Sequence, residues 1–218
     1  MNFGLIADGN RRWAKDKNLS LKEGHFNGFL TIRNEIFPVL EKDPDFKSLS
    51  IYGFSTENWK RNPLEVKNLM NLFKEIFDGW ISELIEKKVR FVHAGRKDRI
   101  PKSLAEKLKK AEELSQKFNR FTIYLCLDYG GRDEILRGFE KIENTKNLNE
   151  KTFSDFLEVP ELDIVVRSGG ENRISNFCIW QAAYAEFFFT KKLLPNLKKK
   201  DIQKILEQFK NRNRRIGK

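Results

Sequence analysis

Short apolar runs alternate with longer amphipathic segments along the chain. Six runs have the length and residue types of buried strands, at Asn2–Ala7, Ser48–Phe54, Val89–Ala94, Phe121–Leu127, Asp163–Val166 and Ala185–Phe189. Apolar residues at helical spacing predict helices over His25–Leu40, Pro63–Lys87, Pro101–Lys117, Arg132–Lys141, Lys151–Leu157 and Lys199–Asn211. Strands that alternate with helices favour an open, mainly parallel six-stranded α/β sheet flanked by helices. We find no repeat, linker or second core pattern, so residues 1–218 are expected to form a single domain.

The chain is strongly basic, and this surplus limits the choice of partner. It has 42 Lys and Arg against 31 Asp and Glu, a formal net charge of +11. Such a charge indicates an anionic partner: nucleic acid, a phosphorylated small molecule or an anionic membrane surface. The arginines cluster with Gly and Asn after predicted strands rather than along one helix, which argues against a nucleic-acid-binding module.

The sequence indicates neither a membrane span nor a secretory signal. The least polar stretch, Ile174–Thr190, contains Glu186 and is too short for a spanning helix. The strand-like start at Asn2 has no basic region or cleavage site before it. Cys126 and Cys178 lie in apolar surroundings, so we expect neither a disulfide framework nor a zinc site. A reducing, cytoplasmic location follows as the expectation.

Polar clusters follow four of the predicted strands, at residues 8–13, 54–61, 128–132 and 167–173. The carboxyl ends of parallel strands lie at one edge of a sheet, where open α/β folds bind ligands. We therefore expect these four loops to converge on one site.

The first cluster has the composition of a phosphate-binding turn. The backbone N–H groups of Gly9, Asn10, Arg11 and Arg12 are suited to an anion, and a helix that begins nearby would add partial positive charge. The alternative is an ordinary Asp-Gly turn with solvated arginines. The standard glycine motifs of nucleotide-binding proteins do not occur in the chain.

Three arginines follow strands in the other clusters, and their guanidinium groups suit the bidentate binding of a diphosphate. These are Arg61, Arg167 and Arg173; the alternative is that they form structural ion pairs with Glu57 and Glu171. Both interpretations stay open on the sequence alone.

Two carboxylates are candidate magnesium ligands. Asp8 lies beside the phosphate-binding turn, and Mg²⁺ commonly joins one or two carboxylates to substrate phosphate; the alternative is a helix N-cap. Glu186 interrupts an apolar run, where a carboxylate needs a metal ion or an arginine partner. Trp13 and Trp59 stand in corresponding loops, where they either wall an apolar substrate or pack the loops down.

Taken together and in order, these motifs resemble the cis-prenyltransferase family, and within it the undecaprenyl diphosphate synthases. The resemblance covers nearly the whole chain and rests on residues 8–14, 24–25, 54–61, 129–132, 163–177 and 180–186. It implies an open, mainly parallel α/β fold with an apolar tunnel, a homodimer, and Mg²⁺ as the cofactor. The apolar face of the predicted helix Pro63–Lys87 would wall this tunnel, although most such faces are ordinary core.

The resemblance also implies roles for individual residues. Asp8 would bind Mg²⁺ and assist departure of the allylic diphosphate, and Asn58 would accept a proton or organise its acceptor. The allylic diphosphate would lie among Gly9, Asn10, Arg11, Arg12, Trp13, His25 and Arg61, and the second motif comprises Ser55, Thr56, Glu57, Asn58 and Trp59. Isopentenyl diphosphate would be bound by Arg167, Arg173, Ile174 and Ser175, Glu186 would be the second metal carboxylate, and Arg215-Ile216-Gly217 would reach a partner subunit's site.

The activity implied is sequential condensation of isopentenyl diphosphate onto farnesyl diphosphate with Z geometry. The product would be a long-chain polyprenyl diphosphate, undecaprenyl diphosphate or a relative of another length, and its chain would bring the enzyme into peripheral contact with a membrane. Leu21 stands where many bacterial members have an arginine, and Asn172 replaces a histidine sometimes assigned to the metal site.

Overall fold

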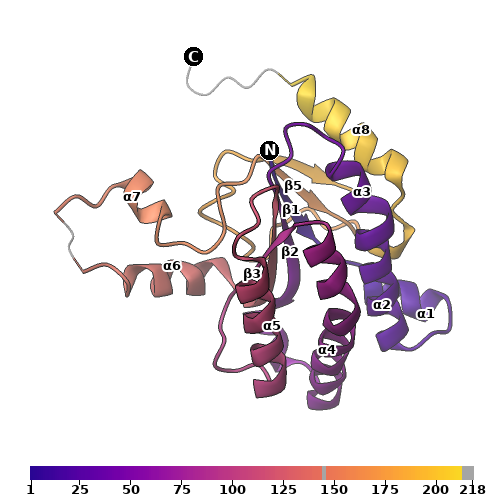
Figure 1. The fold of residues 1–218 in the computed structure, drawn as a ribbon. Helices are drawn as coiled ribbons and strands as arrows, with labels where there is room; N and C mark the ends of the chain where they lie inside the picture. Colours follow the sequence, from indigo (N-terminus) through magenta and orange to yellow (C-terminus); the bar gives the residue numbers. More distant parts are fainter. Residues whose placement is uncertain (144–145, 213–218) are drawn as a thin grey trace.

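The chain folds around one sheet of six strands. The computed structural model describes residues 1–143 and 146–212. Its strands are β1 (Asn2–Ile6), β2 (Ser48–Ser55), β3 (Arg90–Ala94), β4 (Thr122–Tyr129), β5 (Ile164–Arg167) and β6 (Glu186–Phe189), in the spatial order β3-β4-β2-β1-β5-β6 (Figure 1). Every pairing is parallel. The predicted open parallel sheet is confirmed, and each strand lies within two residues of its expected bounds.

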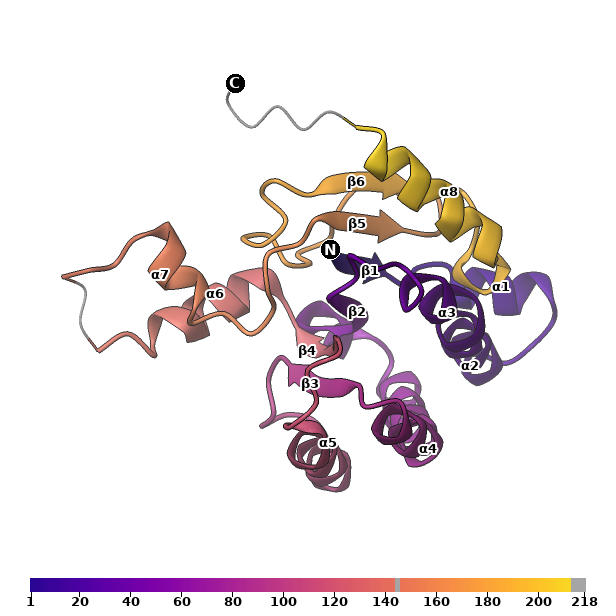
Figure 2. The same cartoon turned by 45° about the horizontal axis from the view of Figure 1, so that its top comes forward.

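The helices divide unequally between the two faces of the sheet (Figure 2). One face carries α2 (Leu21–Thr31), α3 (Phe37–Leu40), α4 (Pro63–Glu86), α5 (Lys102–Ser115) and α8 (Lys199–Lys210), and the short α1 (Asn10–Asp16) packs beside α2. On the other side, α6 (Gly131–Phe139) and α7 (Glu150–Ser154) extend away from the body. Within residues 1–143 and 146–212, no helix is long and apolar enough to cross a bilayer.

Alternation along the strands builds a core on both faces. On β4, Ile123 and Leu125 belong to the larger cluster under α2–α5 and α8, and Cys126 faces the smaller cluster on the opposite face. Side chains of a strand point alternately to its two faces, so a fully buried strand contributes to both. This explains why the strands read as near-continuous apolar runs in the sequence.

The predicted helix His25–Leu40 is wrong in its start and in its regularity. The helix begins at Leu21, where the Ser20 Oγ accepts from the Glu23 backbone N–H (3.2 Å) and the Glu23 carboxylate accepts from the Ser20 N–H (2.8 Å). This capping box satisfies two backbone donors that the apolar periodicity does not report. A π-helical turn, Ile32–Ile36, then precedes Pro38, a residue that cannot donate the next backbone hydrogen bond.

The order of the strands places a topological switch beside β1. From β1 the chain moves to β2 on one side, and later returns to β5 and β6 on the other. Crevices outside the carboxyl ends of strands at such a switch are the usual ligand sites of open α/β sheets. Asp8 follows β1 and Arg167 ends β5, so both lie at this point.

Candidate active site

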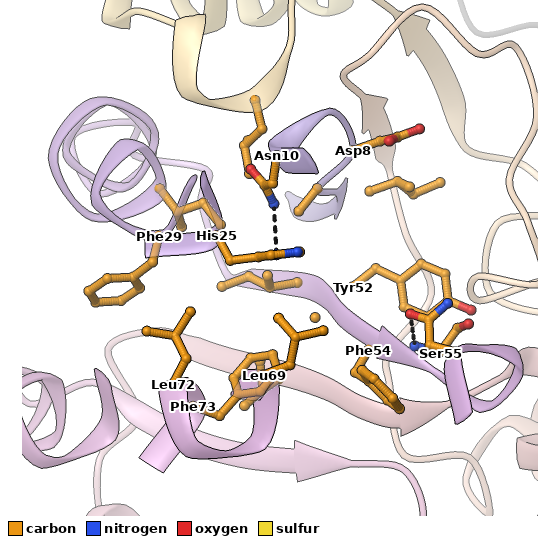
Figure 3. A pocket seen from close by; sticks show the side chains of 18 of the residues that line it. Asp8, Asn10, His25, Phe29, Tyr52, Phe54, Ser55, Leu69, Leu72 and Phe73 are labelled. Carbon is orange, nitrogen blue, oxygen red and sulfur yellow. Dashed lines mark hydrogen bonds between the residues drawn. The ribbon is translucent and has the colours of Figure 1, made fainter. Parts of the chain in front are cut away.

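A cavity of about 370 Å³ opens at the carboxyl edge of the sheet, between the strand ends and helices α2 and α4 (Figure 3). Its polar end is lined by Asp8, Asn10, His25, Tyr52, Ser55, Asn58, Arg61, Arg167 and Ser175. The rest of the wall is mostly apolar, with Phe29, Ile32, Ile51, Leu69, Leu72, Phe73, Ile76, Phe77 and Trp80 among its residues. Figure 3 shows His25 between these two ends, with Asp8 on one side and Phe29, Leu72 and Phe73 on the other. The cavity can therefore hold an anionic group joined to an apolar chain.

A partly buried ion pair joins the end of β5 to the turn after β1 at the polar end. Arg167 is 5% exposed, and its guanidinium donates to the Asp8 carboxylate (2.9 Å) and to the Ser175 Oγ (2.7 Å). The Arg167 Nε, also buried, has no partner among the described residues. The Ser168 Oγ accepts from the Asp8 N–H (3.0 Å) and donates to the Asp8 carbonyl (2.7 Å), which fixes the backbone that carries the carboxylate.

The turn after β1 depends on close backbone approaches. Gly9 has φ 104°, and a Cβ there would lie 2.9 Å from the backbone of Leu193, so only glycine fits. Asn10 begins α1 and is buried against α2, where a Cβ at Gly28 would lie 2.3 Å from the Asn10 Oδ1. Asp8 is not the N-cap of this helix, because Gly9 takes that position.

His25 is held as a neutral imidazole, and one of its ring nitrogens has no hydrogen-bond partner among the described residues. The Asn10 amide donates to its Nδ1 at 3.4 Å, which leaves the proton on Nε2, a buried atom with no partner in the described chain. Burial, followed by the charges of Arg61 and Arg11, lowers the pKa of His25 to about 4. His25 can therefore donate an uncharged hydrogen bond at the polar end.

Two arginines share one carboxylate at the start of α4. Glu65 pairs with Arg61 at 3.3 Å and with Arg11 at 3.4 Å. Burial and the neighbouring Arg11 lower the pKa of Arg61, against the opposing charge of Glu65. The local charge remains positive because two guanidinium groups face one carboxylate, and this favours an anion in the cavity.

The turn after β2 brings Ser55 and Asn58 to the cavity wall. It is the short 3₁₀ helix Thr56–Lys60, and its Asn58 Oδ1 accepts from the Ser55 N–H at 3.2 Å (Figure 3). Trp59 points elsewhere: its indole donates to Asp128 at 2.7 Å and its ring packs against Phe54.

Several residues predicted to bind substrate lie outside the cavity wall. They are Gly9, Arg11, Arg12, Trp13, Thr56, Glu57, Trp59, Arg173 and Ile174. The Trp13 indole donates to Asn196 at 2.9 Å, so for both Trp13 and Trp59 the structure supports loop packing, the alternative that the sequence left open. Arg12 is half exposed and reaches Asp8 at 3.3 Å.

The remaining loop residues support those in the cavity. The Asn176 amide donates to Glu57 at 2.8 Å, and its oxygen accepts from the Arg132 N–H at 2.9 Å, so it joins two of the four predicted loops. Arg173 is exposed and pairs with Glu171 at 2.6 Å, while its carbonyl accepts from Arg167. The loop at residues 128–132 does not line the cavity, and the other three loops do.

Glu186 does not lie beside Asp8 in this chain. It pairs with Ile164 at the amino end of β5, three residues before Arg167, which corresponds to about 10 Å along the strand. Its carboxylate forms an ion pair with Arg212. This is the arginine-partner alternative for Glu186, and the described residues of the single chain do not bring Glu186 and Asp8 together in one metal site.

The fit of a magnesium ion rests on Asp8. Among the described residues, no group of three or more His, Cys, Asp or Glu side chains could hold a metal by itself, and Asp8 is the only carboxylate among the described residues that line the cavity. Mg²⁺ usually combines one or two carboxylates with substrate phosphate and water. The donor set therefore fits a metal that arrives with a diphosphate.

The sequence reading missed residues whose role is to support the site. Ser168 fixes the Asp8 backbone, and Glu65 forms ion pairs with two arginines. Gly28 lacks a Cβ and so leaves room for the Asn10 side chain. Only Glu65 had a sequence signal, because it is an acidic residue in the first turn of the predicted helix Pro63–Lys87, four positions after Arg61.

Comparisons with known proteins agree with this geometry. The family model described as "Putative undecaprenyl diphosphate synthase" matches residues 6–217. The chain is 39% identical to the isoprenyl transferase of Thermotoga maritima and 37% identical to that of Fusobacterium nucleatum, over 99% of its length and 96% and 95% of theirs.

Two solved structures share the fold at 30% identity. Lavandulyl diphosphate synthase from Lavandula x intermedia, in complex with dimethylallyl diphosphate, has a TM-score of 0.91, and a probable undecaprenyl diphosphate synthase from Campylobacter jejuni has 0.86. Each comparison covers 100% of this chain and 98% of the other. The chain belongs to the undecaprenyl diphosphate synthase family of isoprenyl transferases, the cis-prenyltransferases, and is an enzyme of that family.

Proposed function

We propose that this enzyme condenses isopentenyl diphosphate onto farnesyl diphosphate, repeatedly and with Z geometry, to give a long-chain polyprenyl diphosphate. The observation that carries the proposal is a partly buried Asp8–Arg167 pair at the polar end of a cavity whose remaining wall is mostly apolar. Undecaprenyl diphosphate, the lipid carrier precursor for cell-wall synthesis, is the product we propose.

The allylic diphosphate is placed at the polar end, beside α1 and the start of α4. Arg61 supplies charge there, and the His25 Nε2–H supplies an unpaired donor. Arg11 and Arg12, which pair with Glu65 and Asp8, add positive charge that draws the anion in. The isoprenoid chain then extends along the apolar wall, where Phe29, Phe73 and Trp80 exclude water.

We assign isopentenyl diphosphate to the β5 side, where Arg167 and Ser175 line the cavity and the Arg173 carbonyl accepts from Arg167. In the reaction the allylic C–O bond breaks and diphosphate leaves. The isopentenyl double bond attacks the allylic carbon, and loss of a proton from the new cation restores an alkene. Asn58 is positioned in the wall to orient the group that takes this proton.

The carboxylate of Asp8 is the proposed ligand for Mg²⁺. The bound ion would neutralise charge that develops on the departing diphosphate. The contribution of the chain is to hold the Asp8 oxygens in place through Arg167 and the Ser168 hydroxyl. Glu186 of the same chain lies away from this site, so a Glu186 that binds the metal would have to come from a second copy of the chain. The role of Glu186 as a metal ligand stays a prediction.

The length of the product has an alternative assignment. A cis-prenyltransferase of another chain length is the alternative, and it has specific support because a structure similar to this chain is a lavandulyl diphosphate synthase. The product analysis below separates the two.

We further propose a homodimer. Helices α6 and α7 extend from the body (Figure 2), and Leu136, Phe139 and Tyr184 on this side of the sheet are 66%, 59% and 77% exposed. A second copy of the chain would cover these side chains. The predicted contact of Arg215-Ile216-Gly217 with a partner's site lies outside the described residues. A cytoplasmic location, with membrane contact through the product, completes the proposal.

The test is incubation with farnesyl diphosphate, radiolabelled isopentenyl diphosphate and Mg²⁺, followed by chain-length analysis. We expect a ladder of products that ends at a long polyprenyl chain, and no turnover after chelation of the metal. A single condensation with no further elongation would support the short-chain alternative. For the dimer, mixing a subunit without residues 215–218 with an Asp8→Ala subunit should restore part of the activity.

A further inference from the structure

Strands β2 and β4 pair irregularly where they reach the site. The register passes over one extra residue on β2 at Gly53, and then over one extra residue on β4 at Asp128. The side chains show the second shift, because Leu127 and Tyr129 belong to opposite core clusters although they lie two positions apart. Such a bulge redirects a side chain, and bulges occur often next to active sites.

The bulged Asp128 carries a fully buried carboxylate on a left-handed backbone, with φ 50°. Arg99 donates to both of its oxygens, at 2.5 and 2.9 Å, and the Trp59 indole N–H donates to one of them at 2.7 Å. A buried charge and a positive φ each carry a cost, and both persist only where the surroundings fix them. The fold therefore keeps the Asp128 carboxylate at this position in spite of a cost in stability, which indicates a role for its contacts.

The indole links Asp128 to the cavity wall. Trp59 directly follows Asn58 in the 3₁₀ turn, and its ring packs edge-on against Phe54 with centroids 5.2 Å apart. Phe54 and Asn58 line the cavity, whereas Trp59 and Asp128 do not. Asp128 thus holds the turn from behind without reaching the space in which substrate would lie.

We propose that Asp128, acting through Trp59, is a positioning residue for Asn58 in isoprenyl transfer. The proposal rests on the proposed role of the Asn58 turn in the reaction. The alternative is that Asp128 only neutralises Arg99. The two interpretations differ in whether the hydrogen bond from the Trp59 N–H to Asp128 affects catalysis, because an ion pair between Asp128 and Arg99 alone does not need this bond.

The test compares Asp128→Asn and Trp59→Phe in the full-length enzyme. Asparagine tolerates the left-handed backbone, and phenylalanine keeps an aromatic ring against Phe54 while removing the indole donor. We expect each change to lower kcat by about 10- to 100-fold, the range that a small misplacement of a catalytic group produces. The KM of the allylic diphosphate should change less than kcat, because His25 and Asp8, which lie in other segments, are held by contacts outside the turn.

Two matched variants control for generic losses. Trp180→Phe removes an indole hydrogen bond of the same kind, to the Ser154 hydroxyl at 3.0 Å, far from the turn. Asp98→Asn breaks an exposed ion pair with Arg96 in the loop that also carries Arg99. Both should keep kcat near that of the unmodified enzyme.

The double variant Asp128→Asn with Trp59→Phe gives the decisive comparison. If both residues act through one hydrogen bond, its kcat should be close to that of the more impaired single variant. Additive losses, or a normal kcat in Trp59→Phe, would overturn the proposal. If Asp128→Asn does not fold, Trp59→Phe alone still decides. Two further measurements distinguish failure of this proposal from failure of the proposed function. A normal kcat in Asn58→Ala would refute the role of Asn58. If the unmodified enzyme used dimethylallyl diphosphate but not farnesyl diphosphate, only the proposed substrate would be refuted.

Discussion

The two ends of the cavity are built in different ways. At the polar end, hydrogen bonds and ion pairs fix Asp8, Asn10 and Arg167, and the Asp8–Arg167 pair joins segments 159 positions apart in the chain. At the apolar end, Phe29 and Phe77 pack edge-on around Trp80 at 5.3 and 6.4 Å, and packing alone defines the wall. Directional bonds set positions of atoms, whereas packing sets volume and shape.

The difference implies that the two ends respond differently to substitution. Changes at the polar end should alter rate and affinity with little effect on which product forms. Changes at the apolar end should alter the product with little effect on the first condensation.

Asp8→Ala should lower turnover by about a thousandfold or more, because it removes the proposed metal ligand that acts in the transition state. Binding of the allylic diphosphate, measured by calorimetry, should persist. Asp16→Ala, at the exposed end of α1, is the matched control. Near-normal turnover of Asp8→Ala at saturating Mg²⁺ would contradict the assignment.

The two arginines that contact Asp8 should differ in importance. Arg167→Gln removes a buried guanidinium, and the loss of about 2–4 kcal/mol expected for such a pair lowers kcat/KM for isopentenyl diphosphate by about 30- to 1,000-fold. Arg12→Gln affects a half-exposed pair, worth about 1 kcal/mol or less, so its effect should stay below about fivefold. Equal effects would show that burial does not decide the contribution.

The buried His25 predicts an acid-sensitive fold. Its pKa of about 4 lies below the ordinary 6.5, so the unfolded chain binds a proton first as the pH falls. The contribution of His25 to stability is therefore complete above pH 6.5 and is lost toward pH 4, by about 3 kcal/mol. Denaturant unfolding of His25→Gln should show a shallower pH dependence than the unmodified chain. An NMR titration of His25 with a pKa near 6.5 would contradict this account.

Gly53→Leu should shorten the product and leave the first condensation nearly unchanged. A Cβ at Gly53 would lie 3.1 Å from Leu125 and 3.3 Å from Phe73, so a longer side chain must enter the cavity. Gly79→Leu on α4 is the matched control, because nothing lies within 4 Å of its Cβ position. Chain-length analysis is the measurement. If Gly53→Leu keeps the product length and only stability falls, this part of the wall is core rather than tunnel.

The fold could be predicted from the sequence to a large extent because its signals are local. Strand runs such as Phe121–Leu127 are buried on both faces, and Pro63 marks the start of the long helix that the structure shows as Pro63–Glu86. The capping box at Ser20 was also written in the sequence, yet apolar periodicity alone placed the helix start four residues too late. Element boundaries depend on polar caps, which periodicity does not register.

The site was predictable only in part. By itself, the sequence determined the parallel sheet, the loops that follow its strands and the chemistry available in them, because these depend on residue type and spacing. The tertiary structure alone decided that Arg167 pairs with Asp8, that Glu186 pairs with Arg212, and that Trp59 turns away from the cavity to Asp128. Arg167 and Asp8 lie 159 positions apart in the chain, and Trp59 and Asp128 lie 69 positions apart. Which partner a charged or polar side chain finds depends on the register of the strands and on a bulge, and neither is encoded in the local pattern.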